Sequence, residues 1–299
     1  MFDFRYHALS LTAVLIALVV GLLLGVAIGD RNLVSSAQRG LRDSLRRDVN
    51  AARAENSQLS GQLSFRSRFE SLVYPDLVAG RLGGRRVGLL VLGGASDEIS
   101  GLVRSALEPA GGRLVLAAAV REPPDLASLA AAAPAGSRFS KLASDPSLVG
   151  SLGRHLGLAV ARGARPAVAG RTRLLDTERG PLLSSFNGSL APLDGVVVLR
   201  NDASIAPGPP ATAANALDAG LVAGLVAANV PVVGVETSAT ASSQVPWYGQ
   251  QKLASVDDLD DIAGRAALVF ALGGAHGAYG TKPTAEALLP RLVSTSSAP

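Results

Sequence analysis

Few side chains in this chain could bind a soft metal or act as a nucleophile. It has no cysteine, one methionine at position 1, and three histidines, His7, His155 and His276, which lie far apart in the sequence. The lack of cysteine excludes disulfide bonds, thiolate metal sites and cysteine nucleophiles. The spacings G-x-S-x-G and H-E-x-x-H are also absent. We therefore predict that the protein is not an enzyme and has no catalytic residues, metal ligands or cofactor.

Two glycine-rich segments are the candidates for ligand binding. In the first, Gly93 and Gly94 follow an apolar run and precede Ser96 and Asp97. Backbone N–H groups at such a helix start can hold an anion. A tight turn with Ser96 or Asp97 as the helix N-cap explains the pattern as well, and neither glycine-rich nucleotide-binding motif is present.

The second segment, 273–283, places several glycines around His276, Tyr279 and Lys282. Because glycine permits positive φ and close backbone approach, this segment could form a binding loop. The alternative is a mobile connector to a C-terminal helix, Ala285–Leu292. The predicted ligand-binding residues of the two segments are Gly93, Gly94, Ser96, His276, Tyr279 and Lys282.

An acidic run, Asp257-Asp258-Leu259-Asp260-Asp261, could attract a hard cation. It lacks the alternate oxygen ligands and distant Glu of an EF-hand loop. The other interpretation is that these acids stabilise the N-terminus of a helix.

Short apolar runs bounded by Gly, Pro or Asp predict the elements that must position these residues. Such runs are typical of strands buried on both faces, and they occur at 87–92, 114–117, 196–199 and 230–235. Helical patterns lie between them at 97–107, 211–228 and 258–272. The alternation predicts an α/β domain at 85–299 with a mostly parallel sheet.

The N-terminal segment is apolar enough to cross a membrane. After a short tail, 1–7, residues 8–29 contain no charged side chain, which is the length a bilayer requires. A cleavable signal usually has an apolar region of only ~7–15 residues, so we predict a permanent transmembrane helix, with cleavage near Gly29 as the alternative. The arginines after residue 30 favour a cytoplasmic domain, whereas the missing cysteine and signal-like start favour export. We expect an extracytoplasmic C-terminal domain.

Residues 30–74 are predicted to form a coiled-coil stalk. Apolar or small residues recur there at spacings of three and four, beginning at Val34, Ala37 and Leu41. Pro75 should end the helix at Tyr74. Asn56 lies on the seam and would fix the register of a parallel homodimer, although the helix could instead pack on its own domain. The predicted dimerisation residues are Leu45, Val49, Ala52, Asn56, Leu59 and Leu63.

The positive charge does not indicate nucleic-acid binding. The formal net charge is +4 and the pI is about 9.8, but the basic residues are mostly arginines spread along the chain. There is no basic block and no interleaving of basic and aromatic residues. We predict a membrane-associated protein with no nucleic-acid partner.

Both ends of the chain resemble one family. The start, Phe2-Asp3-Phe4-Arg5-Tyr6-His7, precedes the apolar helix, and Gly280-Thr281-Lys282 is followed by Ala285 and Leu288-Leu289-Pro290. Together with the coiled coil and the α/β body, these resemble the MctB family of actinobacterial copper-transport proteins. The resemblance implies an envelope protein in copper efflux or homeostasis, described for the family as pore-forming in the outer membrane.

The small number of side chains that could bind copper suggests a second function. Copper(I) prefers Cys and Met ligands and copper(II) prefers imidazole, and this chain has few of either. Proteins that resemble the family are also linked to daughter-cell separation, through a membrane-protein partner and control of peptidoglycan hydrolysis. A copper-export component and a coiled-coil envelope scaffold are therefore both expected functions.

Overall fold

The computed structural model describes residues 4–28, 31–94, 97–163, 179–201 and 205–291. The chain divides into two compact units, Met1–Arg68 and Phe69–Pro299. The first unit contains α1 (Phe4–Ile28) and most of α2 (Arg31–Val78). The second contains the last turns of α2 and all of the sheet.

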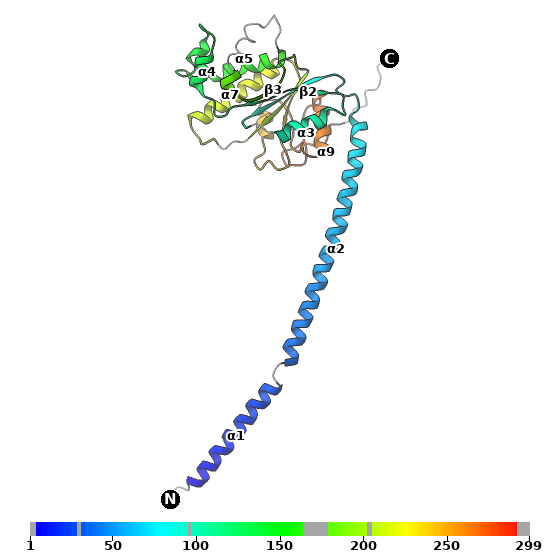
Figure 1. Ribbon diagram of the computed structural model, residues 1–299, viewed down its shortest axis with the longest axis vertical. Helices are drawn as coiled ribbons and strands as arrows, with labels where there is room; N and C mark the ends of the chain where they lie inside the picture. The colour runs from blue at the N-terminus through cyan, green and yellow to red at the C-terminus, as the bar shows by residue number, and fades with distance from the viewer. Residues whose placement is uncertain (1–3, 29–30, 95–96, 164–178, 202–204, 292–299) are drawn as a thin grey trace. The chain divides into compact units, whose positions relative to one another are not determined.

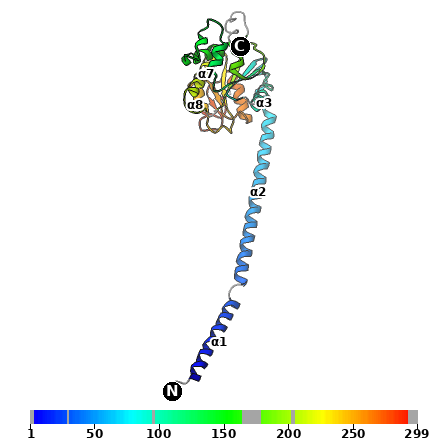
Figure 2. The same cartoon turned by 60° about the vertical axis from the view of Figure 1, so that its left-hand side comes forward.

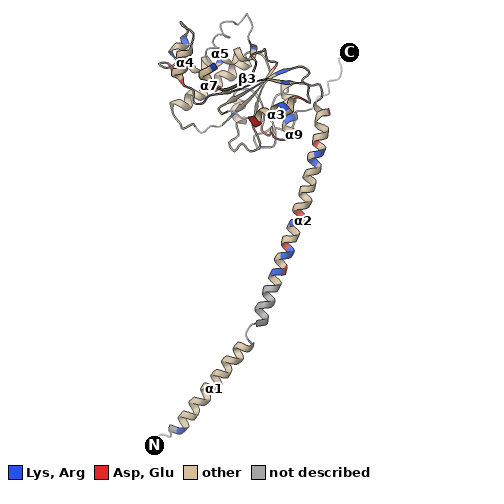
Figure 3. Ribbon diagram, in the orientation of Figure 1, with Lys and Arg blue, Asp and Glu red and all other residues tan. Residues whose placement is uncertain are grey.

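Helix α1 is apolar along its length. The span Arg5–Ala27 has a mean hydropathy of 2.7, and none of its apolar window is buried in the protein. Figure 3 shows no charged side chain along α1 beyond its first turn. A helix of this length and composition can cross a membrane, and it associates the protein with one. Gly29, the predicted last residue of the span, lies outside the described residues.

Helix α2 continues past Pro75 to Val78, so the predicted end at Tyr74 is wrong. Proline removes one helical hydrogen bond and crowds the preceding turn, but burial of the neighbouring side chains offsets this cost. The Tyr74 hydroxyl donates to the Ala106 carbonyl at 2.8 Å, and Val78 is fully buried in the core of the second unit.

The second unit is built on one sheet (Figure 1). Among the described residues the strand order is β3-β2-β1-β4-β5-β6-β7, and every pairing except that of β3 with β2 is parallel. This confirms the predicted α/β class with a mostly parallel sheet. The strands are β1 (Arg86–Leu92), β2 (Arg113–Val120), β3 (Leu183–Gly188), β4 (Gly195–Arg200), β5 (Val232–Val235), β6 (Ala254–Val256) and β7 (Ala278–Tyr279).

Helices cover both faces of the sheet (Figures 1 and 2). Helices α3 and α9 share one hydrophobic core with the end of α2, and α4, α5 and α7 share the other. The helices are α3 (Asp97–Leu107), α4 (Leu126–Ala132), α5 (Val149–Arg162), α7 (Pro209–Val226), α8 (Val245–Gln250) and α9 (Ile262–Leu272), with 3-10 turns η1 (Arg138–Lys141) and η2 (Pro146–Leu148).

Strand β1 shows why the strand sequences are continuously apolar. Leu89 and Val91 point into the α3–α9 core, whereas Leu90 and Leu92 point into the α5–α7 core. Because both faces are buried, each position requires an apolar side chain.

Helices α5 and α7 approach each other closely through glycines. A Cβ atom at Gly157 would lie 2.1 Å from the Leu221 carbonyl oxygen, and one at Gly224 would lie 2.2 Å from that of Arg154. The two backbones are therefore in direct contact, which leaves room for no side chain at these positions.

Two predicted helices differ from the observed structure. The described part of 285–292 is not helical; it lies beside β7, where the Glu286 N–H donates to the Ala278 carbonyl at 2.8 Å. Prolines at 283 and 290 leave too short a segment for a stable helix. Helix α9 begins at Ile262 rather than at 258, because Asp261 caps it by accepting a hydrogen bond from the Ala263 N–H at 2.9 Å.

Candidate functional site

Charged side chains gather at the carboxyl edge of the sheet. Parallel strands end at the same edge, so residues that are far apart in the sequence meet there. Arg200 is the last residue of β4, Glu236 follows β5, Asp257 follows β6, and Glu122 lies two residues after β2. We call the group of side chains that runs from Lys282 to Glu122 the carboxyl-edge network.

Lys282 begins the network. Its Nζ atom donates to Glu236 Oε1 at 2.7 Å and to the carbonyls of Thr237 and Thr240 at 2.9 Å each. The Glu236 side chain is fully buried. Asp257 accepts hydrogen bonds from the main-chain N–H groups of Thr281 (2.8 Å) and Lys282 (3.2 Å). The Gly280–Lys282 segment is thus tied to the ends of β5 and β6.

Arg200 forms the middle of the network. Glu236 Oε2 accepts a hydrogen bond from the Gln244 N–H at 2.6 Å, and the Gln244 side-chain oxygen accepts one from Arg200 at 2.7 Å. Arg200 Nε also donates to Asp218 Oδ2 at 3.2 Å, and its guanidinium lies 4.9 Å from the centre of the Trp247 ring. These contacts join β4, β5, α7 and α8.

Glu122 and Asp218 form a carboxyl pair at the other end. Their carboxyl groups are close enough to interact electrostatically, and among the described residues Glu122 Oε1 and Asp218 Oδ1 have no hydrogen-bond partner. Burial, and then the negative charge of Asp218, raises the pKa of Glu122 to about 8. Burial also raises the pKa of Asp218, so both carboxyl groups keep their protons to a higher pH than exposed carboxyl groups do.

The strand order reverses between β1 and β4, and Gly93 lies at this position. Its φ is +108°, and a Cβ atom there would lie 3.2 Å from the Asn201 Cβ and 3.7 Å from Glu122 Oε2. Doubly wound folds often bind ligands at this point. Gly94 follows at the same end of β1, whereas Ser96 lies outside the described residues.

The predicted ligand-binding residues do not form one site. Gly93 and Gly94 follow β1, whereas Tyr279 and Lys282 belong to the β7 edge, and β4, β5 and β6 lie between. The Tyr279 hydroxyl donates to the His276 carbonyl at 2.6 Å, and the His276 side chain is exposed. Whether either loop binds a ligand stays a prediction.

The histidines lie in separate elements. His7 is on α1 and His276 is in the loop before β7. His155, on α5, has its Nδ1 2.8 Å from the Ser151 carbonyl and its ring 5.5 Å from that of Phe139. Among the described residues, no three His, Asp or Glu side chains converge in a way that could hold a metal ion. Met1 lies outside them.

The seam residues of α2 are exposed. Side-chain exposure is 53% at Leu45, 45% at Val49 and 62% at Leu63, and Asn56 is exposed on the same helix. The side chains of Val34 and Ala37 are outside the described set. Figure 3 shows acidic and basic residues interspersed along the described part of α2. Dimerisation through the seam stays a prediction.

Sequence reasoning missed the central residues of the network. Asp218 could have been identified from the sequence, because it is the one charged residue in the 18-residue helix α7. Arg200 and Glu236 each directly follow a run of buried apolar residues. A charge at the carboxyl end of a buried strand is a general indication of a site at that edge.

Comparisons with known proteins agree over nearly the whole chain. The model of a family described as copper transport outer membrane protein, MctB, matches residues 1–290. A protein named copper transporter MctB from Mycobacterium tuberculosis (strain ATCC 25618 / H37Rv) is 28% identical over 324 residues, covering 94% of this chain and 96% of the relative. The protein of the same name from Mycobacterium bovis matches to the same extent.

Proposed function

Because the chain belongs to the MctB family of copper transport outer membrane proteins, we propose that it is a membrane-anchored envelope component of copper export. The observation that carries this proposal is the family match over residues 1–290, which includes both the apolar helix and the α/β unit. Copper is the cargo in this role, and the α1 helix holds the protein at the membrane.

We further propose that the protein supports export without a tight copper(I) site of its own. Such a site needs two or three convergent soft ligands, and the sequence has no cysteine and a single methionine. His155 Nδ1 lies 2.8 Å from the Ser151 carbonyl. The His276 side chain is exposed, and its main-chain carbonyl accepts a hydrogen bond from the Tyr279 hydroxyl.

A copper-tolerance assay tests the export role. Deletion of the gene should lower the copper concentration that the cells survive, and both the wild-type gene and His276→Ala should restore it. Unchanged tolerance after deletion would refute the export role. Submicromolar copper(I) affinity of the purified full chain in a competition titration, lost in His276→Ala, would instead show direct binding.

The orientation is part of the proposal. We place the α/β unit outside the cytoplasm, which suits a chain without cysteine. A reporter enzyme that functions only outside the cytoplasm should be active when it is fused after Pro299. Activity of a cytoplasm-specific reporter at the same position would reverse the assignment.

The exposed seam of α2 favours a second function, a coiled-coil scaffold that acts in daughter-cell separation through a membrane partner. A parallel dimer would bury Leu45, Val49, Leu59 and Leu63, which are each at least 45% exposed in the single chain, and it would pair Asn56 with its copy.

Sedimentation of the purified chain tests the dimer. The wild type should be a dimer at tens of micromolar, and Asn56→Leu should change or broaden the distribution of oligomers, because the buried Asn pair specifies two strands. A monomeric wild type would exclude the coiled coil. Affinity capture from membranes should then recover a membrane protein through α2, and Leu45→Asp should abolish that recovery.

A further inference from the structure

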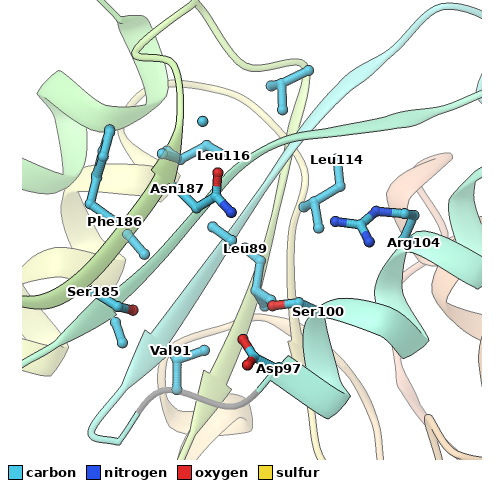
Figure 4. Close-up of a pocket in the computed structure, with 15 residues that line it drawn as sticks. Leu89, Val91, Asp97, Ser100, Arg104, Leu114, Leu116, Ser185, Phe186 and Asn187 are labelled. Atoms are coloured by element: carbon cyan, nitrogen blue, oxygen red, sulfur yellow. The ribbon is translucent and has the colours of Figure 1, made fainter.

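A groove of about 480 Å³ lies on the α3 side of the sheet, and no residue of the carboxyl-edge network lines it (Figure 4). Its floor is apolar and consists of Leu89 and Val91 from β1 with Ala117 and Ala119 from β2. Cavities of this size accommodate small organic ligands.

Polar side chains stand along both sides of this floor. Asp97, Ser100 and Arg104 come from α3 at i, i+3 and i+7, a spacing that places them on one face of the helix. Ser185 and Asn187 come from β3, and alternate residues of a strand share a face. Figure 4 shows the Asp97 carboxylate, the Arg104 guanidinium and the Asn187 amide around the floor.

The two charges in the groove are unpaired in the described part of the chain. Neither the Asp97 carboxylate nor the Arg104 guanidinium has a hydrogen bond or ion pair there, and both residues are exposed. Seven residues of helix separate their Cα atoms by ~10.5 Å, which is too far for the two groups to neutralise each other directly. The groove thus presents a negative group at one end and a positive group at the other.

We propose that this groove binds a short zwitterionic peptide of about three residues. Its ammonium group would contact Asp97, and its carboxylate would accept a bidentate hydrogen bond from Arg104. An extended chain advances ~3.3–3.6 Å per residue, so three residues match the ~10.5 Å between the two charges. The Asn187 amide supplies a donor and an acceptor for a peptide bond, and the apolar floor takes small side chains.

The proposal does not rest on copper export, because the residues that line the groove include neither a histidine nor a member of the carboxyl-edge network. The two charges also suit the dipole of α3, with an acid in its first turn and a base in its last. If the two charges only stabilise the helix dipole, the groove binds no peptide. The titration below distinguishes this helix-stabilising role from peptide binding.

Isothermal titration of the full chain in detergent with trialanine tests the proposal. N-acetyl-trialanine and trialanine amide are the matched ligands, because each lacks one terminal charge. Trialanine should bind, and Arg104→Gln and Asp97→Asn should each weaken its binding at least tenfold. Arg154→Gln, an exposed change on α5 at the opposite face, should have no effect.

Measuring each variant with each modified ligand tests whether Arg104 binds the peptide carboxylate and Asp97 binds the peptide ammonium group. Arg104→Gln should not weaken binding of trialanine amide further, and Asp97→Asn should not weaken binding of N-acetyl-trialanine further, because the partner charge is already absent. Far-ultraviolet circular dichroism must show that each variant is folded. No binding of trialanine at millimolar concentration would overturn the proposal, and so would binding that is insensitive to both variants.

Discussion

Replacing Lys282 by Met separates a structural role of the Gly280–Lys282 segment from a ligand-binding role. The change removes the charge partner of Glu236, whose side chain is fully buried, and the donor of the Thr237 and Thr240 carbonyls. Removing one partner of a buried ion pair typically costs ~3–5 kcal/mol.

The lower end of that range applies here, because Glu236 keeps two donors. Ser243 Oγ lies 2.8 Å from Oε1, and the Gln244 N–H lies 2.6 Å from Oε2. We therefore expect Lys282→Met to lower the free energy of unfolding by about 3 kcal/mol. Adding Glu236→Gln should recover part of this loss, because the double variant buries no unpaired charge.

Guanidinium unfolding followed by tryptophan fluorescence measures the effect. The single tryptophan, Trp247, lies on α8 beside Arg200 and so reports on the α/β unit. Lys141→Met, at an exposed position, is the matched control and should change stability by less than ~0.5 kcal/mol. Lys282 does not stabilise the unit by pairing with Glu236 if Lys282→Met is as stable as the control, or if the double variant is less stable than Lys282→Met alone.

Two further predictions concern the same unit. Because the folded pKa of Glu122 is about 8, above its ordinary value of 4.5, the wild type should lose stability as pH rises between these values, by roughly 2 kcal/mol after allowance for partial exposure. Glu122→Gln should flatten this dependence in unfolding curves at pH 5, 7 and 9, and an unchanged slope would contradict the raised pKa of Glu122. Gly157→Ala should destabilise the unit by about 3 kcal/mol in thermal unfolding, because its Cβ would overlap the Leu221 carbonyl. Gly101→Ala, in open space on α3, should be neutral or stabilising, and equal effects of the two would refute the packing argument.

The sequence predicted those elements whose pattern is local. Strands β1, β2, β4 and β5 are apolar runs buried on both faces, and α3 has a clear amphipathic period, so its bounds were predicted correctly. Strands β6 and β7 have three and two residues, which is too short for periodicity to be visible. Pro75 misled the prediction because tertiary burial of Tyr74 and Val78, which no local pattern shows, holds the last turn of α2.

The network was harder to predict because its members are isolated in the sequence. Glu122, Arg200, Asp218 and Glu236 come from four separate segments, and only the strand order brings them to one edge. Lys282 was identified, but as a ligand-binding residue. Its three bonds within the protein became evident only when β5 and β7 were placed in one sheet.

The positions of the bonded and unbonded charges indicate where a ligand would be recognised. A doubly wound sheet usually binds its ligand at the carboxyl edge, where charged groups remain available. In the described part of this chain, Lys282, Glu236, Arg200 and Asp218 bond to one another or to main-chain groups at that edge. A ligand there would have to break these bonds and leave buried charges unpaired, which is costly. Recognition of a small charged molecule is therefore favoured in the groove beside α3, whose charges have no partner to lose.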